Sequence, residues 1–195
     1  HEPKISKEAL RARVLELMEL VEIDRPMERM KLYPHNFSGG MRQRAVMAIA
    51  LAARAKILLA DEPTTALDVT IQAQILDLLL ELRRQMGMSI ILVTHNLGIV
   101  SETADHVAVM YLGRVVEYGE TDDVIAHPFH PYTRVLISHC ADVDPDQVRS
   151  GLPIEGEPPT PINPGPGCYF EPRCFKACPG CKNAYPGRVE LGNGH

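Results

Sequence analysis

The sequence predicts an α/β fold followed by a loop-rich tail that carries cysteines. The wholly apolar run 57–60 and the segment 89–93, which is apolar after Ser89, have the length of strands that are buried on both faces of a sheet. The segment between them, 69–86, repeats its apolar residues at helical spacing. A strand, a helix and a second strand in this order predict a right-handed parallel crossover. Ten of the sixteen prolines lie at Pro145 or later, where the helical period disappears.

Two further helices are predicted ahead of the first apolar run, and a hairpin after the second. Residues 6–22 have helical periodicity, with Ser6 at the N-cap. The second helix follows Ser38-Gly39-Gly40, and its expected apolar stripe consists of Met41, Ala45, Ala48, Ile49 and Ala52. Residues 107–111 and 114–117 flank Leu112-Gly113, which predicts a hairpin.

Charge and cysteine usage narrow the functional classes. The net charge of −5 gives no sign of the basic surface that nucleic-acid-binding proteins use, so no nucleic-acid partner is expected. No apolar run reaches the roughly 20 residues that cross a bilayer, and no signal-peptide pattern opens the chain. The chain begins without Met, which suggests a fragment.

Four of the five cysteines lie within residues 168–181, which favours metal binding in a reducing compartment over a disulfide scaffold.

Asp61 and Glu62 directly follow the first apolar run. This is the strand end at which α/β sheets bind ligands. The first carboxylate could hold Mg²⁺ and its waters, and the second could polarise an attacking water. A solvated acidic turn is the simpler explanation for such a pair on its own, and the neighbouring motifs are what favour a ligand site.

Three segments together resemble the diagnostic motifs of ABC ATPases. Residues 37–44 (FSGGMRQR) resemble the signature sequence, residues 59–68 (LADEPTTALD) the Walker B strand with its D-loop, and residues 91–95 (ILVTH) the switch histidine. Their order and spacing match the family. The resemblance implies a partial P-loop NTPase domain with a helical subdomain, and a cysteine-containing extension after it.

The resemblance divides the chain into three parts. Residues 1–56 would be the rest of the helical subdomain with the signature motif. Residues 57–143 would be the later part of the ATPase core, and residues 144–195 the C-terminal extension. A P-loop needs Gly-x₄-Gly-Lys-Ser/Thr, and none of the six lysines follows a glycine. Without that loop, this segment alone is expected not to hydrolyse ATP.

The resemblance also implies roles for particular residues. Asp61 would hold Mg²⁺ through water, Glu62 would be the general base, and His95 would contact the γ-phosphate of ATP and the attacking water. Asp68 would reach the other nucleotide site of a dimer. It is also expected to cap the helix 69–86, and the two roles are compatible.

The signature motif has a physical reason to face a phosphate. Ser38, Gly39, Gly40 and Gln43 would contact the ATP that is bound to the partner subunit. Because Ser38-Gly39-Gly40 opens a helix, unpaired N–H groups and the helix dipole point toward an anion. Glycine lets the backbone approach the phosphate closely, although a plain Gly-Gly turn is the alternative reading.

Further segments resemble the importers of dipeptides, oligopeptides and nickel. They are residues 65–76 (TALDVTIQAQIL), 127–133 (HPFHPYT) and 167–174 (GCYFEPRC). The resemblance implies an ATPase that powers import of short peptides, with a nickel-importer ATPase as the alternative. Implied partners are a sister ATPase, in a homo- or heterodimer, two membrane permeases and a peptide-binding protein. The implied location is the cytoplasmic face of the membrane.

The cysteines of the tail resemble the metal-binding pattern of the same group. Cys168, Cys174 and Cys181 fit its first three positions, and the fourth would follow His195. Cys178 is additional and could take the fourth place. The resemblance implies a [4Fe–4S] cluster, with zinc or unligated thiols as the alternatives.

Two other functions share some of these features. DNA-repair and chromosome-organising ATPases have the same signature and Walker B motifs, but the chain offers no room for their long coiled coils, and its acidic balance is unfavourable. A regulatory metal-binding tail on a fold that does not hydrolyse ATP is the non-enzymatic alternative.

Overall fold

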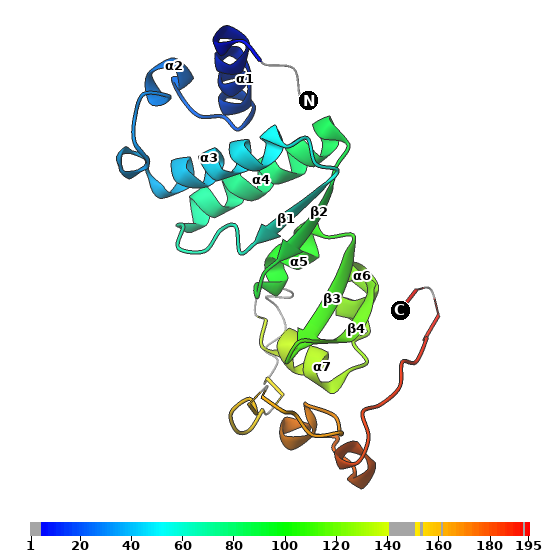
Figure 1. The fold of residues 1–195 in the computed structure, drawn as a ribbon. Coiled ribbons are helices and arrows are strands. Elements are labelled where there is room, and N and C mark those ends of the chain that lie inside the picture. The colour runs from blue at the N-terminus through cyan, green and yellow to red at the C-terminus, as the bar shows by residue number, and fades with distance from the viewer. Residues whose placement is uncertain (1–4, 141–150, 153, 161, 193) are drawn as a thin grey trace. The chain divides into compact units, whose positions relative to one another are not determined.

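The computed structural model describes residues 5–140, 151–152, 154–160, 162–192 and 194–195. The chain forms two compact units, His1–Val93 and Thr94–His195 (Figure 1). The first unit therefore contains the signature, Walker B and D-loop segments, and the second begins just before the expected switch histidine. The three-part division made from the motifs stays a prediction.

The first unit consists of helices that pack against one face of a pair of strands. Its elements are α1 (Lys7–Leu20), α2 (Pro26–Arg29), η1 (Pro34–Asn36), α3 (Gly39–Ala52), β1 (Ile57–Asp61), α4 (Val69–Met86) and β2 (Ser89–Val93). β1 and β2 pair in parallel, with Ile57 opposite Ser89 and Asp61 opposite Val93. The parallel crossover through α4 that the sequence predicts is confirmed.

Local capping residues explain where these helices begin and end. The Ser6 hydroxyl accepts a hydrogen bond from the Ala9 N–H at 3.1 Å, as expected for an N-cap. Asp68 caps α4 in the same way, accepting from the Ile71 N–H at 3.0 Å. Gly87 ends α4 in the left-handed conformation, at φ 62°. The predicted caps Ser6 and Asp68 are confirmed.

The core of the first unit joins α1, α3 and α4. Its buried residues are Leu17, Met18, Val21, Ile23, Met47, Ala48, Leu51, Ile75, Leu78, Leu79, Leu82 and Met88. The apolar stripe predicted for α4 is confirmed. The stripe predicted for α3 is wrong in part, because Ile49 is 74% exposed while Met47 and Leu51 are buried. Alanines occur all around α3, so its apolar period was too weak to fix the buried face.

The two strands are covered on one face by the described residues. Leu58 and Ile90 pack against the helical core, whereas Ile57 and Leu59 are 58% and 65% exposed. Since successive side chains point to opposite faces, one face of the pair is apolar and open in this part of the chain. The expectation that these strands are buried on both faces is therefore wrong for the described structure.

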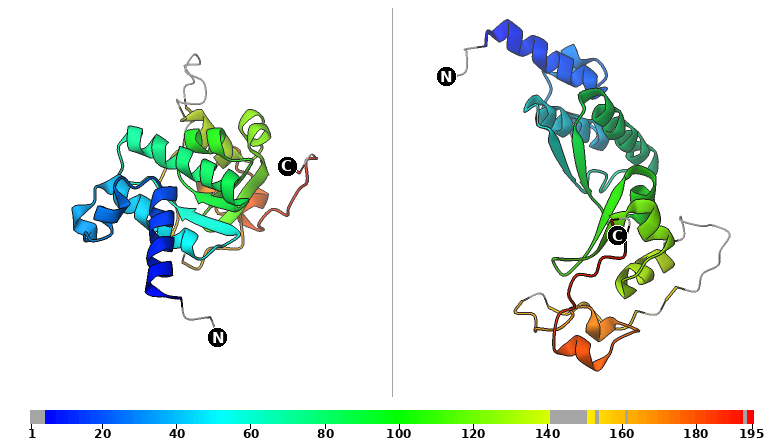
Figure 2. Two further views of the ribbon diagram at one scale, coloured as in Figure 1. Left: turned by 90° about the horizontal axis from the view of Figure 1, so that it is seen from above. Right: turned by 90° about the vertical axis from the view of Figure 1, so that its right-hand side faces the viewer.

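The second unit is built around a hairpin. Its elements are α5 (Leu97–Thr103), β3 (His106–Tyr111), β4 (Arg114–Glu120), α6 (Thr121–Ala126), α7 (Pro131–Ser138), η3 (Glu171–Arg173) and η4 (Pro179–Lys182). β3 and β4 are antiparallel, and their turn places Leu112 at φ 45° and Gly113 at φ 77°. Two positive φ values are typical of a tight hairpin turn. The predicted hairpin is confirmed, and α6 packs against it (Figure 2).

The tail is anchored to this hairpin by aromatic side chains. Phe170 is 1% exposed, and its ring lies 5.2 Å from that of Tyr111 and 5.4 Å from that of Tyr132. The Arg114 guanidinium lies over the rings of Tyr169 and Tyr185, at 4.9 and 4.4 Å. A proline-rich segment that lacks helical periodicity is thus held in place by long-range contacts.

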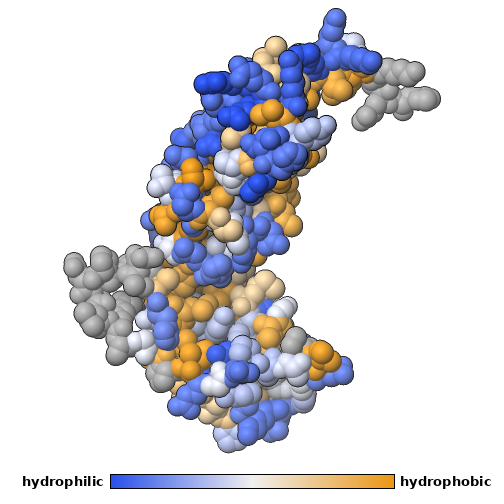
Figure 3. Space-filling model, turned by 90° about the vertical axis from the view of Figure 1, so that its left-hand side faces the viewer, coloured by the Kyte–Doolittle hydropathy of each residue, from blue (hydrophilic) through white to orange (hydrophobic). Residues whose placement is uncertain are grey.

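Within the described residues, no helix combines the length and the apolar character that a membrane span requires. Apolar side chains do reach the surface in several places (Figure 3).

Replacing Ile75 by alanine should destabilise the protein by about 2–5 kcal/mol, because the side chain is fully buried in α4 and its loss leaves a cavity. Urea unfolding of the variant measures this change. Ile49→Ala on α3 is the matched control and should change stability by no more than about 0.5 kcal/mol, since Ile49 is exposed. Equal effects of the two substitutions would contradict the assigned core.

Candidate functional site

The signature segment starts a helix as expected. The Ser38 hydroxyl accepts a hydrogen bond from the Met41 N–H at 3.3 Å, and α3 begins at Gly39. Ser38 is exposed and Gln43 is half-buried on the same helix. The free N–H groups of this first turn, together with the helix dipole, give it the character of an anion site.

The two glycines of this motif have a packing role that the sequence alone did not show. A Cβ on Gly40 would lie 2.7 Å from Cγ2 of Ile71, and a Cβ on Gly39 would lie 3.1 Å from Cδ2 of Leu67. Both contacts are shorter than ordinary van der Waals separation. The start of α3 is therefore packed directly against the D-loop and the start of α4, and at Gly40 a larger residue would force Ile71 to move.

The acidic pair lies at the carboxyl end of β1. Asp61 is the last residue of the strand and pairs with Val93, and the Glu62 N–H donates to the Val93 carbonyl at 2.9 Å. Both acidic residues are exposed. The hydrogen-bond ladder thus continues one residue past the strand and fixes the backbone of the acidic pair. The pair lies at the carboxyl end of the strand, as the sequence predicts.

Glu62 is held in a defined conformation. Its φ is 42°, in the left-handed region that non-glycine residues seldom adopt. The Thr65 hydroxyl donates to Glu62 Oε2 at 2.7 Å, which orients the carboxylate. Backbone strain of this kind is stored more often at functional sites than elsewhere.

The D-loop consists of two successive turns between β1 and α4. The Thr65 N–H donates to the Glu62 carbonyl and the Leu67 N–H to the Thr64 carbonyl, each at 3.2 Å. Ala66 between them has φ 62°. The turns lead directly into Asp68, whose carboxylate caps α4 by accepting a hydrogen bond from the Ile71 N–H. Its reach to a second nucleotide site stays a prediction.

His95 is the second residue of the second unit, after Thr94, and is exposed. The turn around it is fixed by hydrogen bonds on either side. The Thr94 hydroxyl accepts from the Asn96 N–H at 3.1 Å, and Asn96 Oδ1 accepts from the Gly98 N–H at 2.9 Å to cap α5. His95 therefore sits on a short, well-defined turn that follows β2.

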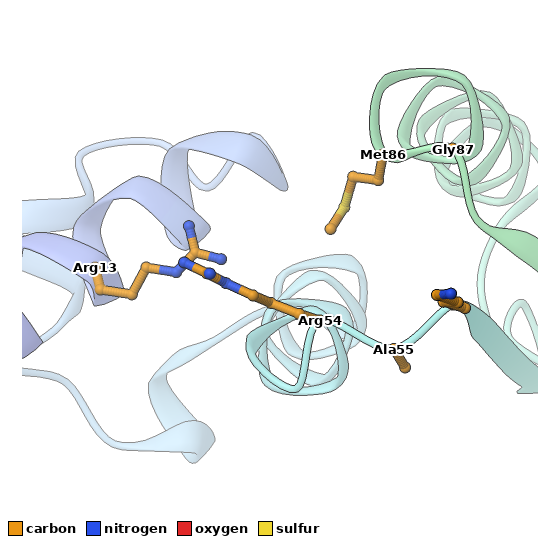
Figure 4. Close-up of a pocket in the computed structure, with 6 residues that line it drawn as sticks. Arg13, Arg54, Ala55, Met86 and Gly87 are labelled. Carbon is orange, nitrogen blue, oxygen red and sulfur yellow. The ribbon is translucent and has the colours of Figure 1, made fainter. Parts of the chain in front are cut away.

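A surface hollow in the first unit lies away from the predicted residues (Figure 4). Its volume is about 380 Å³, and it is lined by Arg13, Arg54, Ala55, Lys56, Met86 and Gly87. Lys56 precedes β1, so the hollow lies at the opposite end of the strand from Asp61. It contains none of the residues that the motifs single out.

The four cysteines of the tail gather around one loop. The sulfurs of Cys178 and Cys181 are 3.4 Å apart, and the Cys168 N–H donates to the Cys181 carbonyl at 2.7 Å. A Cβ on Gly167 would lie 2.4 Å from the Cys181 carbonyl oxygen, so glycine is required there. The hydrogen bond from the Cys181 thiol, followed by those from backbone N–H groups, lowers the pKa of Cys178. Burial raises the pKa of Cys174.

The described cysteine side chains are not placed as the complete ligand set of a metal ion. Among the described residues, no group of three or more His, Cys, Asp or Glu side chains is placed to hold a metal ion. Two thiolates on one tetrahedral zinc, with bonds of about 2.3 Å, would keep their sulfurs roughly 3.8 Å apart. The thiols of a [4Fe–4S] cluster bind different irons and must lie further apart still. The 3.4 Å contact of the Cys178 and Cys181 sulfurs is shorter than either of these spacings.

Two family descriptions match separate parts of the chain. Residues 2–65 match the ABC transporter family, and residues 116–181 match the oligopeptide/dipeptide transporter C-terminal region. The chain is 49% identical over 192 residues to the dipeptide transport ATP-binding protein DppD of Bacillus subtilis (strain 168), covering 98% of this chain and 57% of that protein. It is 48% identical over 170 residues to the oligopeptide transport ATP-binding protein OppD of Salmonella typhimurium (strain LT2), covering 87% and 50%. Over almost its whole length, the chain is thus similar to ATP-binding proteins of ABC transporters.

Solved structures of ABC cassettes have the same fold. The chain is 32% identical to cbiO1 of Clostridium perfringens, with a TM-score of 0.56 over 65% of this chain and 49% of that one. It is 30% identical to the bacterial ABC transporter cassette MJ0796, with a TM-score of 0.54 over 62% and 51%. The predicted fold class, part of an ABC-type P-loop NTPase domain, is confirmed. The chain spans about half the length of the curated relatives described above.

One polar cluster of the second unit was not foreseen from the sequence. The His195 ring contacts Glu117 Oε1 through Nε2 at 2.8 Å and Asp123 Oδ2 through Nδ1 at 3.0 Å. The side chains of His195 and Glu117 are each 4% exposed. The Glu117 carboxylate also accepts from the N–H groups of Phe129 and His130, so this buried group has three hydrogen-bond partners. We call this group of His195, Glu117 and Asp123 the His195 clasp. Nothing in the Gly194-His195 sequence predicts it.

Gly40→Ala should destabilise the protein by about 1–3 kcal/mol, because the added methyl group overlaps Ile71. The test is a double-mutant cycle with Ile71→Ala, read by urea unfolding. The cost of Gly40→Ala should be smaller in the Ile71→Ala background, where the overlapping methyl group is absent. A cost that is the same in both backgrounds would show that the overlap is not its cause.

The His195 clasp should loosen in acid. Hydrogen bonds from His127 and then from His195 lower the pKa of Asp123 below its ordinary 3.8. A lowered carboxylate pKa stabilises the fold above pH 3.8, and this contribution is lost as pH falls through the folded-state pKa. NMR cross-peaks between the rings of His195 and Phe129, which lie 5.3 Å apart, should fade in that range.

Asp123→Asn should weaken these cross-peaks at neutral pH and flatten their response to acid. Asp122→Asn, one residue earlier on α6, is the matched control and should leave both unchanged. An Asp123→Asn protein with wild-type cross-peaks and a wild-type acid response would rule out the clasp as described.

Proposed function

We propose that the protein is an ATP-binding and ATP-hydrolysing subunit that powers the import of di- or oligopeptides by an ABC transporter. The observation that carries this proposal is the parallel pairing of Asp61 with Val93, which holds Asp61 and Glu62 at the ligand-binding edge of the sheet. The same unit contains the signature helix. Curated relatives with dipeptide and oligopeptide transport in their names favour peptides over the nickel alternative.

The two acidic residues would divide the chemistry between them. Asp61, exposed at the strand end, would hold Mg²⁺ through water molecules, and the ion would neutralise charge on the phosphates. Glu62 would accept the proton of the attacking water. The Thr65 hydroxyl supports this role because it holds the carboxylate of Glu62 in one orientation. A general base must be positioned before its basicity matters.

The signature motif would act on the ATP of a second subunit. Ser38, Gly39 and Gly40 would present the N–H groups of the α3 start to its γ-phosphate, with Gln43 on the same helix. Asp68 would reach across the dimer from the adjoining D-loop. His95 would contact the γ-phosphate and the attacking water. The packing of Gly39 and Gly40 on Leu67 and Ile71 supports this scheme, because it couples the signature helix to the D-loop mechanically.

The proposed assembly follows from this role. Two ATPase subunits, identical or sister proteins, would pair around ATP and drive two membrane permeases that receive peptides from a binding protein. The subunit would sit at the cytoplasmic face of the membrane as a peripheral component. No metal cluster enters the proposal, because no group of described residues is placed to hold a metal ion.

Glu62→Gln in the full-length protein should reduce steady-state ATPase activity more than a hundredfold, since removing a group that acts in the transition state costs about 3 kcal/mol or more. Pairing in the presence of ATP should persist and can be followed by size-exclusion chromatography. Asp77→Asn, at an exposed position of α4, is the control and should keep wild-type turnover. Turnover by Glu62→Gln within a few-fold of wild type would refute the base assignment.

A further inference from the structure

The surface hollow at the start of β1 is a positively charged site that the proposed function does not use. Three of its lining residues are cations: Arg13 of α1, and Arg54 and Lys56 of the connection between α3 and β1. We call it the basic hollow, and we infer that it binds a small soluble phosphate monoester through these three side chains. The inference concerns the first unit alone and does not depend on the ATPase role.

Segments far apart in the sequence build the basic hollow. Arg13 extends from α1, and Arg54 extends toward it from the turn after α3 (Figure 4). The Arg54 N–H donates to the Leu51 carbonyl at 3.0 Å, and the Lys56 carbonyl accepts from the Ser89 N–H at 2.9 Å. These two bonds fix the backbone that carries Arg54 and Lys56. The fold itself therefore brings the cations to one concave surface.

The described residues balance only part of this charge. Arg13 pairs with Glu16 at 2.7 Å, and its side chain is 30% exposed. No described carboxylate lies within ion-pair distance of Arg54 or Lys56. Three cations against one carboxylate leave two positive charges. A phosphate monoester carries about −1.5 to −2 at pH 7, so its charge matches that of the hollow.

Helix dipoles do not account for the convergence of the cations. A cation at a helix C-terminus is stabilised by the dipole, and Arg54 lies just past the end of α3. Arg13 lies in the middle of α1, where no helix end is available to it. Two guanidinium groups that extend into one hollow repel each other, and an anion between them removes this repulsion. Guanidinium groups also bind phosphate oxygens through pairs of parallel N–H bonds.

The size of the basic hollow indicates an ester in preference to the free phosphate ion. Its volume of about 380 Å³ lies in the lower part of the range for small-molecule sites, about 300–1,000 Å³. A water molecule takes about 30 Å³, so the hollow has room for roughly a dozen waters. Met86 and Ala55 supply apolar wall beside the cations. A Cβ on Gly87 would meet no atom within 4 Å, which leaves open space there for the body of the ester.

Met86 provides a local probe of binding. Its side chain extends from α4 to the basic hollow (Figure 4), whereas Met27 of α2 is 53% exposed and does not line it. The full-length protein would be labelled with ¹³C at its methionine methyl groups, and the Met86 resonance would be assigned with Met86→Leu. Glucose 6-phosphate would be titrated at constant ionic strength, with glucose as the matched uncharged control. ADP and Mg²⁺ would be present throughout, so that any nucleotide site is already filled.

The inference predicts a saturable shift of the Met86 resonance with glucose 6-phosphate and none with glucose, while the Met27 resonance stays in place. Arg54→Asn should weaken binding about tenfold or more, because it removes a charge-assisted hydrogen bond. Asparagine tolerates the φ of 50° at this position, so the variant keeps the turn. Lys56→Gln, at an exposed residue, should weaken binding in the same direction.

Arg11→Gln is the matched control variant, because it removes one positive charge from α1 at an exposed residue that does not line the hollow. Screening by salt should keep its affinity within about twofold of wild type. Equal losses of affinity in Arg11→Gln and Arg54→Asn would overturn the inference, since they would indicate attraction by net charge alone.

Three other results would also overturn it. One is a Met86 resonance that does not respond to glucose 6-phosphate, or responds without saturation. Another is an equal response to glucose. The third is a response only to vesicles of phosphatidylcholine and phosphatidylglycerol, which would assign the hollow to a membrane surface.

Discussion

The parallel ladder between β1 and β2 is the constraint on which the candidate site depends. It continues past the strand through the bond from the Glu62 N–H to the Val93 carbonyl, so the backbone carrying two acidic side chains is fixed at the edge of the sheet. Positive φ values at Glu62 and Ala66 then turn the chain sharply into the D-loop. Backbone conformations of this type cost of order 1–3 kcal/mol each and persist only where surrounding contacts maintain them. Here the ladder, the Thr65 hydroxyl and the cap at Asp68 maintain them.

A second constraint links this strand end to the signature helix. A Cβ at Gly40 would overlap Ile71, and a Cβ at Gly39 would press on the side chain of Leu67. The glycines therefore permit close packing on the D-loop, and in the proposed function they would also let a phosphate approach the helix start. Because both segments begin helices whose buried faces share one core, a movement of one would be transmitted to the other through packed side chains.

Local signals in the sequence predicted much of this fold. Ser6, Asp68 and Gly87 marked helix ends, the spacing along 69–86 marked a buried stripe, and Leu112-Gly113 marked the hairpin. The motifs also identified the candidate site residues, although their catalytic roles stay predictions. Where prediction was wrong, the deciding information was not local. The buried face of α3 depends on its neighbours, since alanine does not distinguish one side of the helix from another. Burial of β1 and β2 depends on what covers them, and the described residues cover one face.

Long-range contacts account for the features that the sequence did not indicate. His195 and Glu117 are 78 residues apart in the chain, and Phe170 meets Tyr111 across a proline-rich segment. The short helices α5, α6 and α7 span too few turns for periodicity to identify them. The cysteine spacing suggests a metal site by resemblance, but no described group is placed to hold a metal ion, because spacing along the chain does not determine how the sulfurs are turned.

A crystal structure of the full-length protein with ATP and Mg²⁺ would test the central claim most directly. The account predicts that the ion lies within one water molecule of the Asp61 carboxylate and that Glu62 faces the γ-phosphate across a water position. Nucleotide and ion bound away from the carboxyl end of β1, with Asp61 and Glu62 both facing bulk solvent, would contradict it.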